Sequence, residues 1–193
     1  MTLLSSARVV VIAVAAQLLF GCSIFGSNPT TDPTREQRAD PNSGYALLYS
    51  LVSVQKNSDK ILIIRKVSPE VNTLIKEISD IAGELDTQLK QLAKEDPSIK
   101  LDAVVLPKIE VQQRESAQLE RAKQFLTMTG RPFERLLLLT QSGVLTTERH
   151  VTRVMGEEEK NPQRKMFWKD AQRQFDQMYD KILALLESQY YSR

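Results

Sequence analysis

The feature that most constrains the fold of this chain is a run of apolar residues spaced three and four apart between residues 71 and 92. Its members are Val71, Leu74, Ile75, Ile78, Ile81, Ala82, Leu85, Leu89 and Leu92. This spacing places them on one face of an α-helix, and that face must be buried against other elements. Ser68-Pro69-Glu70 is typical of a helix start, and Asp96-Pro97 predicts the end. The sequence therefore predicts one long amphipathic helix.

Helical spacing also precedes this helix. The earlier apolar positions are Tyr45, Leu48, Tyr49 and Val52. They predict a helix that continues through the apolar residues 61–64 after a break at Asn57-Ser58. Because residues 61–67 are rich in β-branched side chains, a strand is the alternative there.

Three further helices are expected after residue 106. The third is predicted from about residue 107 to 129, with Gly130 as its C-terminal cap. The fourth starts at Pro132, and the short link to it implies either a tight antiparallel hairpin or a kink. Asn161-Pro162 marks the start of the last helix. Residues 45–193 are therefore expected to form an all-α, up-and-down bundle of four to five helices.

The N-terminus carries a different signal. Residues 9–20 are apolar apart from Gln17, and Arg8 is the only charged side chain before Cys22. Such a run matches the apolar region of a signal peptide, about 7–15 residues, and is shorter than the ~20 residues of a spanning helix. Residues 1–21 are therefore predicted to be a signal peptide that directs export.

This apolar run ends in Leu19-Phe20-Gly21-Cys22, which resembles the lipobox of bacterial lipoproteins. The resemblance implies cleavage before Cys22 and attachment of lipid, including palmitate-type chains, to its thiol; Phe20 departs from the small or branched residue usual there. Cys22 is the single cysteine of the chain, so it has no disulfide partner within it. The alternative is an ordinary secretory signal followed by an unrelated cysteine.

A lipidated Cys22 implies a cell-envelope protein whose membrane partner is the lipid bilayer, because two or more acyl chains hold a protein stably on a membrane. Ser23 in place of Asp after the cysteine indicates the outer membrane, with the domain facing the periplasm. Residues 22–44 contain three prolines and few apolar residues, which is too little to build a core. They are expected to act as a flexible tether of about 25 Å.

Several functional classes are disfavoured by the sequence. Lys and Arg total 26 and Asp and Glu 24, and this balance gives no electrostatic reason to expect nucleic-acid binding. His150 is the only histidine, and it stands two residues from Glu148 rather than in the Glu-x-x-His pairs of di-iron bundles. We therefore expect no metal, no cofactor and no enzymatic activity. The charge run at residues 157–160 is expected to be solvated, and Trp168 to pack in the core or at its rim.

The predicted third helix is unusually polar for a bundle helix. Such a helix is either a solvated edge helix or a face for a partner. The candidate partner residues are Gln112, Gln113, Arg114, Glu115, Gln118 and Arg121. The partner expected here is another envelope protein.

The stretch Gln118-Leu119-Glu120 through Thr129-Gly130-Arg131-Pro132-Phe133-Glu134-Arg135 is similar to a leucine-rich helix, glycine and Phe-Asp/Glu passage of a bacterial family of ferritin-like helical domains of unknown function. The later Asp-His element of that family is replaced here by Thr147-Glu148-Arg149-His150. The resemblance covers residues 45–188 and implies a four-helix bundle with no known activity.

Two functions remain open from the sequence. The first is a non-catalytic interaction or scaffolding module presented to the periplasm. The second is a bundle that binds a small apolar ligand or a polypeptide segment between its helices, in a pocket lined by Leu136–Leu139, Phe167 and Phe175.

Overall fold

The computed structural model describes residues 41–102 and 108–191, and these ranges contain helices and no strand. The elements are α2 (Pro41–Gln55), the 3₁₀ helix η2 (Ser58–Ile63), α3 (Pro69–Glu95), α4 (Lys108–Thr127), α5 (Gly130–Glu158), α6 (Pro162–Leu186) and a π-helical turn, η3 (Glu187–Tyr191). The all-α fold expected from the sequence is confirmed.

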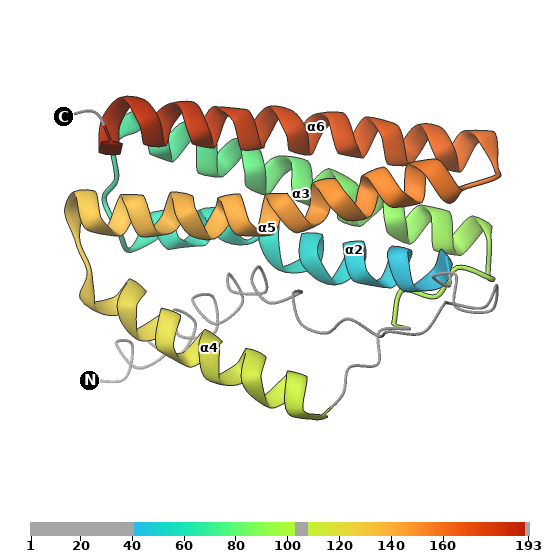
Figure 1. Cartoon of the computed structure of the whole chain (residues 1–193), viewed down its shortest axis with the longest axis horizontal. Coiled ribbons are helices and arrows are strands. Elements are labelled where there is room, and N and C mark those ends of the chain that lie inside the picture. Colours follow the sequence, from blue (N-terminus) through green and yellow to red (C-terminus); the bar gives the residue numbers. More distant parts are fainter. Residues whose placement is uncertain (1–40, 103–107, 192–193) are drawn as a thin grey trace, which may run out of the picture.

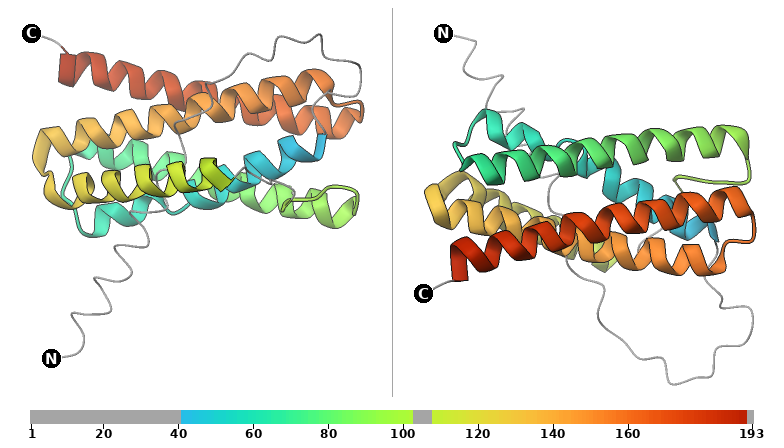
Figure 2. Two further views of the ribbon diagram at one scale, coloured as in Figure 1. Left: turned by 60° about the horizontal axis from the view of Figure 1, so that its bottom comes forward. Right: turned by 90° about the horizontal axis from the view of Figure 1, so that it is seen from above.

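Four of the helices form the bundle itself. In Figure 1, α2, α3, α5 and α6 lie side by side, and helices that follow one another run in opposite directions. Helix α4 runs back along the outside and leaves the bundle at an angle, away from α3 and α6 (Figure 1), and Figure 2 gives two further views of this arrangement. The described chain is thus an up-and-down bundle of four closely packed helices with a fifth attached mainly at one end.

The core confirms the predicted stripe on α3. Val71, Ile75, Ala82 and Leu89 are inaccessible to solvent, and they belong to one continuous apolar cluster formed with α2, α5 and α6. The largest side chains that are almost completely buried in it are Trp168, Phe125, Phe133 and Phe175. Trp168 is therefore a core residue.

The helix starts read from the sequence are confirmed at α3 and α6. At α6, Oδ1 of Asn161 accepts hydrogen bonds from the amides of Gln163 at 2.9 Å and Arg164 at 3.2 Å, and Pro162 follows as the first helical residue. At α3, Ser68 has the extended conformation of a capping residue, but its hydroxyl makes no capping bond. Instead its amide donates to Oε1 of Glu134 at 2.6 Å, which ties the start of α3 to α5.

The first helix differs from the expectation at both ends. It begins at Pro41, four residues before Tyr45, and it stops at Gln55. The apolar residues that follow form the 3₁₀ helix η2, so neither a continuing α-helix nor a strand is found. No helix in the two described ranges has both the length and the apolar composition needed to cross a membrane.

Candidate functional site

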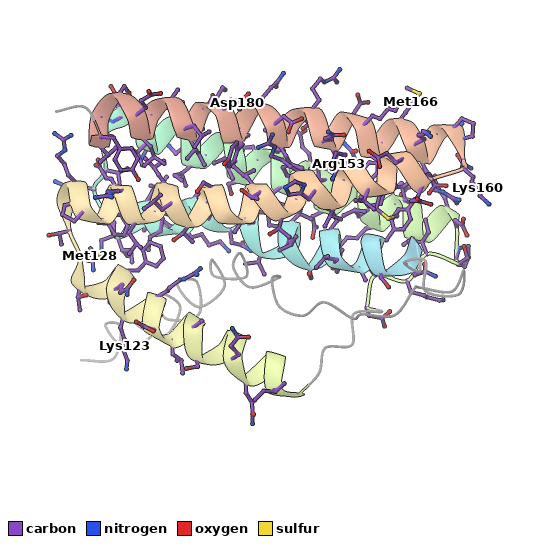
Figure 3. All side chains as sticks on the ribbon, viewed as in Figure 1. Lys123, Met128, Arg153, Lys160, Met166 and Asp180 are labelled. Atoms are coloured by element: carbon purple, nitrogen blue, oxygen red, sulfur yellow. The ribbon has the colours of Figure 1, made fainter. Side chains whose placement is uncertain are left out.

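The polar helix α4 is attached to the bundle through its C-terminal half. Ala122 and Phe125 are buried, and the Phe125 ring meets Phe133 of α5 edge to face with a centroid separation of 5.7 Å. Lys123 projects away from the bundle, and Met128 lies at the turn where α4 joins α5 (Figure 3). The attachment point of α4 is therefore at its C-terminal end, and its N-terminal half extends away from that point.

The guanidinium of Arg65 stabilises this attachment point. Nη2 of Arg65, in the loop after η2, donates hydrogen bonds to the main-chain oxygens of Phe125 at 3.1 Å and Leu126 at 2.5 Å. Its guanidinium also lies 5.9 Å from the centroid of the Phe133 ring. The last carbonyls of a helix carry partial negative charge and lack partners within the helix, so Arg65 acts as a cap for α4.

Four of the six predicted partner residues lie in the N-terminal half of α4, and Gln118 and Arg121 lie in its C-terminal half. Gln112 and Gln113 are exposed and Arg121 is half-buried. Arg114, Glu115 and Gln118 belong to the same helix, but their side chains lie outside the described part of the structure, as does Cys22. Two apolar side chains that precede the attached turn also face solvent, since Ile109 is 74% exposed and Leu119 is 63% exposed. The exposed surface of α4 is therefore mixed, with amide and apolar groups side by side.

A polar cluster closes the end of the bundle where α2 begins. Glu159 accepts from the Tyr45 hydroxyl at 2.7 Å, and both of its oxygens face Arg164, at 3.1 Å from Nε and 3.2 Å from Nη2. Arg164 also pairs with Asp96, and the indole of Trp168 donates to Tyr45 at 3.3 Å. The cluster joins α2, the end of α5 and the start of α6.

Glu159 was expected to be solvated as part of the run 157–160, and that expectation is wrong. Only 5% of its side chain is exposed. Burial on its own would raise the pKa of Glu159, but hydrogen bonds from Arg164, the Asn161 amide and Tyr45 outweigh it and hold the pKa below its ordinary value. The carboxylate is therefore a structural partner of the helix junction.

A cavity of about 350 Å³ lies beside this cluster. Its apolar wall is formed by Tyr45, Ile99 and Met155, and polar and charged side chains line the rest. The sequence placed a pocket at Leu136–Leu139, Phe167 and Phe175 instead. Of that set, Leu137, Leu138 and Phe175 fill the core, and none of the set lines the cavity described here.

Glu148, to which the sequence assigned no structural role, is a completely buried carboxyl group. Glu148 of α5 is 0% exposed, and its carboxyl group lies against the buried amide of Gln55, which in turn contacts Gln141. Burial raises the pKa of Glu148 to about 8, and the hydrogen bond with Gln55 lowers it only in part. His150, two residues further on, is exposed, so the two side chains do not meet.

The described residues hold no group of three or more His, Cys, Asp or Glu side chains that could bind a metal ion. The polar groups that the structure does bring together serve the junctions of the bundle: Arg65 at the end of α4, Glu159 at the end of α5, and Glu148 in the core. Comparison of the chain with protein-family models, with curated proteins and with solved structures found no match.

Proposed function

We propose that this chain is a lipid-anchored envelope lipoprotein whose helical bundle is a non-catalytic interaction module, with α4 as the helix that meets the partner. The observation that carries the interaction is the one-ended attachment of α4, which leaves exposed Ile109 and Leu119 next to exposed amides. The tetrad Leu19-Phe20-Gly21-Cys22 supports the anchor.

The composition of α4 suits a partner surface better than a core. Interfaces of non-obligate complexes are about as apolar as the rest of the surface, with a few apolar anchors among hydrogen-bonding groups. Leu119 is the described apolar residue in the middle of the helix, and Gln112 and Gln113 lie two turns before it. A helix built this way can dock its middle onto an envelope protein without first leaving the bundle.

The anchor is tested by metabolic labelling with a palmitate analogue in cells. The wild-type protein should be labelled and recovered with membranes, and Cys22→Ser should lose both properties. Ser23→Ala keeps the cysteine and serves as the control that should remain labelled. Equal labelling of the wild type and Cys22→Ser would exclude the lipoprotein assignment.

The membrane is tested separately through Ser23. If the protein resides in the outer membrane because Asp is absent after the cysteine, Ser23→Asp should shift it toward the inner-membrane fraction while labelling persists. An unchanged distribution would remove the argument for the outer membrane and leave the anchor intact.

The partner face is tested by crosslinking in intact cells. A variant with Gln112, Gln113 and Arg121 changed to Ala should lose its crosslinked partner and keep the thermal unfolding midpoint of the wild type. The control changes the exposed Lys76 and Asp80 of α3 to Ala, on another helix, and should keep the partner. Capture that survives in the α4 variant shows that the partner binds elsewhere.

A second function is supported by the 350 Å³ cavity beside Tyr45, Ile99 and Met155. Cavities of about 300–1,000 Å³ with apolar walls are the usual size for small-ligand sites. Native mass spectrometry of protein purified from cells separates the two functions. A retained small molecule that is lost on Ile99→Trp, which fills the cavity, would favour ligand binding over the interaction module.

A further inference from the structure

A buried polar triad joins α2 to α5 inside the core. Gln55 is 2% exposed, Gln141 is 1% exposed and Glu148 is 0% exposed. One terminal atom of the Gln55 amide lies 3.1 Å from Oε1 of Gln141, and the other lies 2.9 and 3.1 Å from the two carboxyl oxygens of Glu148. The three side chains thus form a chain of contacts from one helix to the next, and Gln55 stands in its centre.

The triad has no cation within the described residues. The charged groups of the neighbouring helices pair with one another instead: Lys56 of α2 with Asp86 of α3 at 2.9 Å, and Asp176 of α6 with Arg149 of α5. The described charged residues of α4 are Glu120, Arg121 and Lys123, and they precede Phe125, which packs on Phe133. Phe133 itself lies about 20 Å along α5 from Glu148. Nothing described here compensates a negative charge on Glu148.

We propose that Glu148, Gln55 and Gln141 form a proton-binding latch, which holds α2 against α5 while Glu148 is protonated and loosens it when Glu148 loses its proton. This latch is independent of the anchor and of the partner face. It assigns a role to a buried acid that the proposed interaction module does not use.

The direction of the hydrogen bonds explains why the proton matters. When Glu148 is neutral, its hydroxyl donates to Oε1 of Gln55, and Nε2 of Gln55 donates to Oε1 of Gln141 at 3.1 Å. An ionised carboxylate can only accept, so the Gln55 amide must turn to present Nε2 to it. Gln55 then points an oxygen at Oε1 of Gln141, and that amide must turn as well.

Loss of the proton therefore has two costs at the same interface. Two buried amides have to reorient, and a charge without a counter-ion remains in the apolar interior, which is strongly unfavourable. Burial accordingly raises the pKa of Glu148 to about 8. Because Gln55 ends α2 and η2 follows it, the response is expected at this end of α2 rather than in the α5–α6 pair.

The proton is followed directly by ¹³C NMR of the glutamate side chains in the full-length protein. The Glu148 signal, identified by its absence in Glu148→Gln, should titrate well above the ordinary range of carboxyl groups. The side-chain amide signals of Gln55 and Gln141 should shift with the same midpoint. Titration of Glu148 near the ordinary carboxyl range of about 4–5, or amide signals that ignore its proton, would overturn the latch.

The loosening is measured by amide hydrogen exchange, corrected for the intrinsic effect of pH. Between pH 6 and pH 9 the wild-type protection of residues 51–55 should fall at least tenfold, while that of α6 changes little. Glu148→Gln cannot ionise and should keep its protection across this range. The control Glu158→Gln removes an exposed acid from the same helix and should follow the wild type.

Each outcome of the exchange experiment decides the matter. Equal pH dependence in the wild type and Glu148→Gln means that another group controls α2. A uniform loss of protection in all helices means that Glu148 affects global stability without acting on α2. If Glu148→Gln does not fold, the NMR titration of the wild-type Gln55 and Gln141 amides still gives the answer.

Discussion

Arg65 caps the last turn of α4 from a position 60 residues earlier in the chain than Phe125: Nη2 of Arg65 donates to the main-chain oxygen of Phe125 at 3.1 Å. Phe125 is itself 0% exposed. The same turn of α4 is thus fixed twice, by the ring below it and by the cation at its end. Ile109 and Leu119, earlier in α4, are 74% and 63% exposed, so this turn is where the described apolar side chains of α4 are held most firmly.

Removal of the cap should free α4 without unfolding the bundle. Arg65→Ala removes a charged donor that serves two carbonyl oxygens, and hydrogen bonds to charged groups contribute about 1.5–3 kcal/mol each when buried. Because this contact is partly exposed, we expect the free energy of unfolding to fall by roughly 1–2 kcal/mol. Hydrogen exchange at residues 119–127 should rise more than in α6.

The control for this experiment is Lys66→Ala, which removes the neighbouring exposed cation. Surface changes of this kind usually alter stability by less than about 0.5 kcal/mol. If Lys66→Ala exposes α4 as much as Arg65→Ala does, the cap is not what holds the helix.

The ion pair between Glu159 and Arg164 should stabilise the folded protein at neutral pH and lose this effect in acid. Arg164→Ala leaves the buried Glu159 carboxylate without its cation, and breaking a buried pair costs about 3–5 kcal/mol. Since the Arg164 side chain is 26% exposed, we expect a smaller loss, about 2–3 kcal/mol at pH 7. Urea unfolding at a series of pH values measures it.

The sign of the pH dependence follows from the pKa of Glu159, which the folded protein holds below its ordinary value. The stability that comes from this carboxylate is present above its ordinary pKa and is lost as the pH falls through the folded value. The wild type and Arg164→Ala should therefore converge in acid. Arg173→Ala, which breaks an exposed pair with Asp170, should cost less than about 1 kcal/mol. A gap between wild type and Arg164→Ala that stays constant down to pH 3 would contradict this account.

Two glycines should respond to alanine in opposite directions. Gly130 has φ of 63° at the turn into α5, where a side chain is strained, and Gly130→Ala should destabilise by about 1–2 kcal/mol. Gly83 lies inside α3, and a Cβ there would meet only Cβ of Lys56 at 3.9 Å. Gly83→Ala should stabilise by about 0.5–1 kcal/mol. Thermal unfolding of the two variants compares them, and a shift of the same sign in both would show that backbone conformation is not the cause.

The sequence predicted those features of the fold that depend on local interactions. Asn161-Pro162 marks the start of α6 because the capping side chain and the two amides that donate to it are only two and three residues apart. The stripe on α3 is likewise visible, since helical periodicity alone determines which of its residues share a face. The predicted bundle needs only these local elements and short connections.

The polar contacts of the core were not predicted, because their partners are far apart in sequence. Tyr45 and Glu159 are separated by 114 residues, and nothing in the run 157–160 indicates that one of its acids is buried. For Glu148 a signal did exist. Gln141 and Glu148 lie seven residues apart, in step with the apolar residues Leu137, Leu138 and Met155 of α5. A polar residue in phase with a buried stripe is a candidate for a buried polar residue.

The sequence also predicted that α4 is either an edge helix or a partner face, but not which of its ends is attached. Phe125 and Leu119 show which end is attached. Both are large apolar residues of α4, but Phe125 is 0% exposed and Leu119 is 63% exposed. Phe125→Ala should create a cavity against Phe133 and cost about 3–5 kcal/mol, whereas Leu119→Ala should change stability by less than about 0.5 kcal/mol. Urea unfolding of both variants gives the comparison. Equal losses would mean that the middle of α4 is packed as firmly as its end, and that Leu119 is not free to meet a partner.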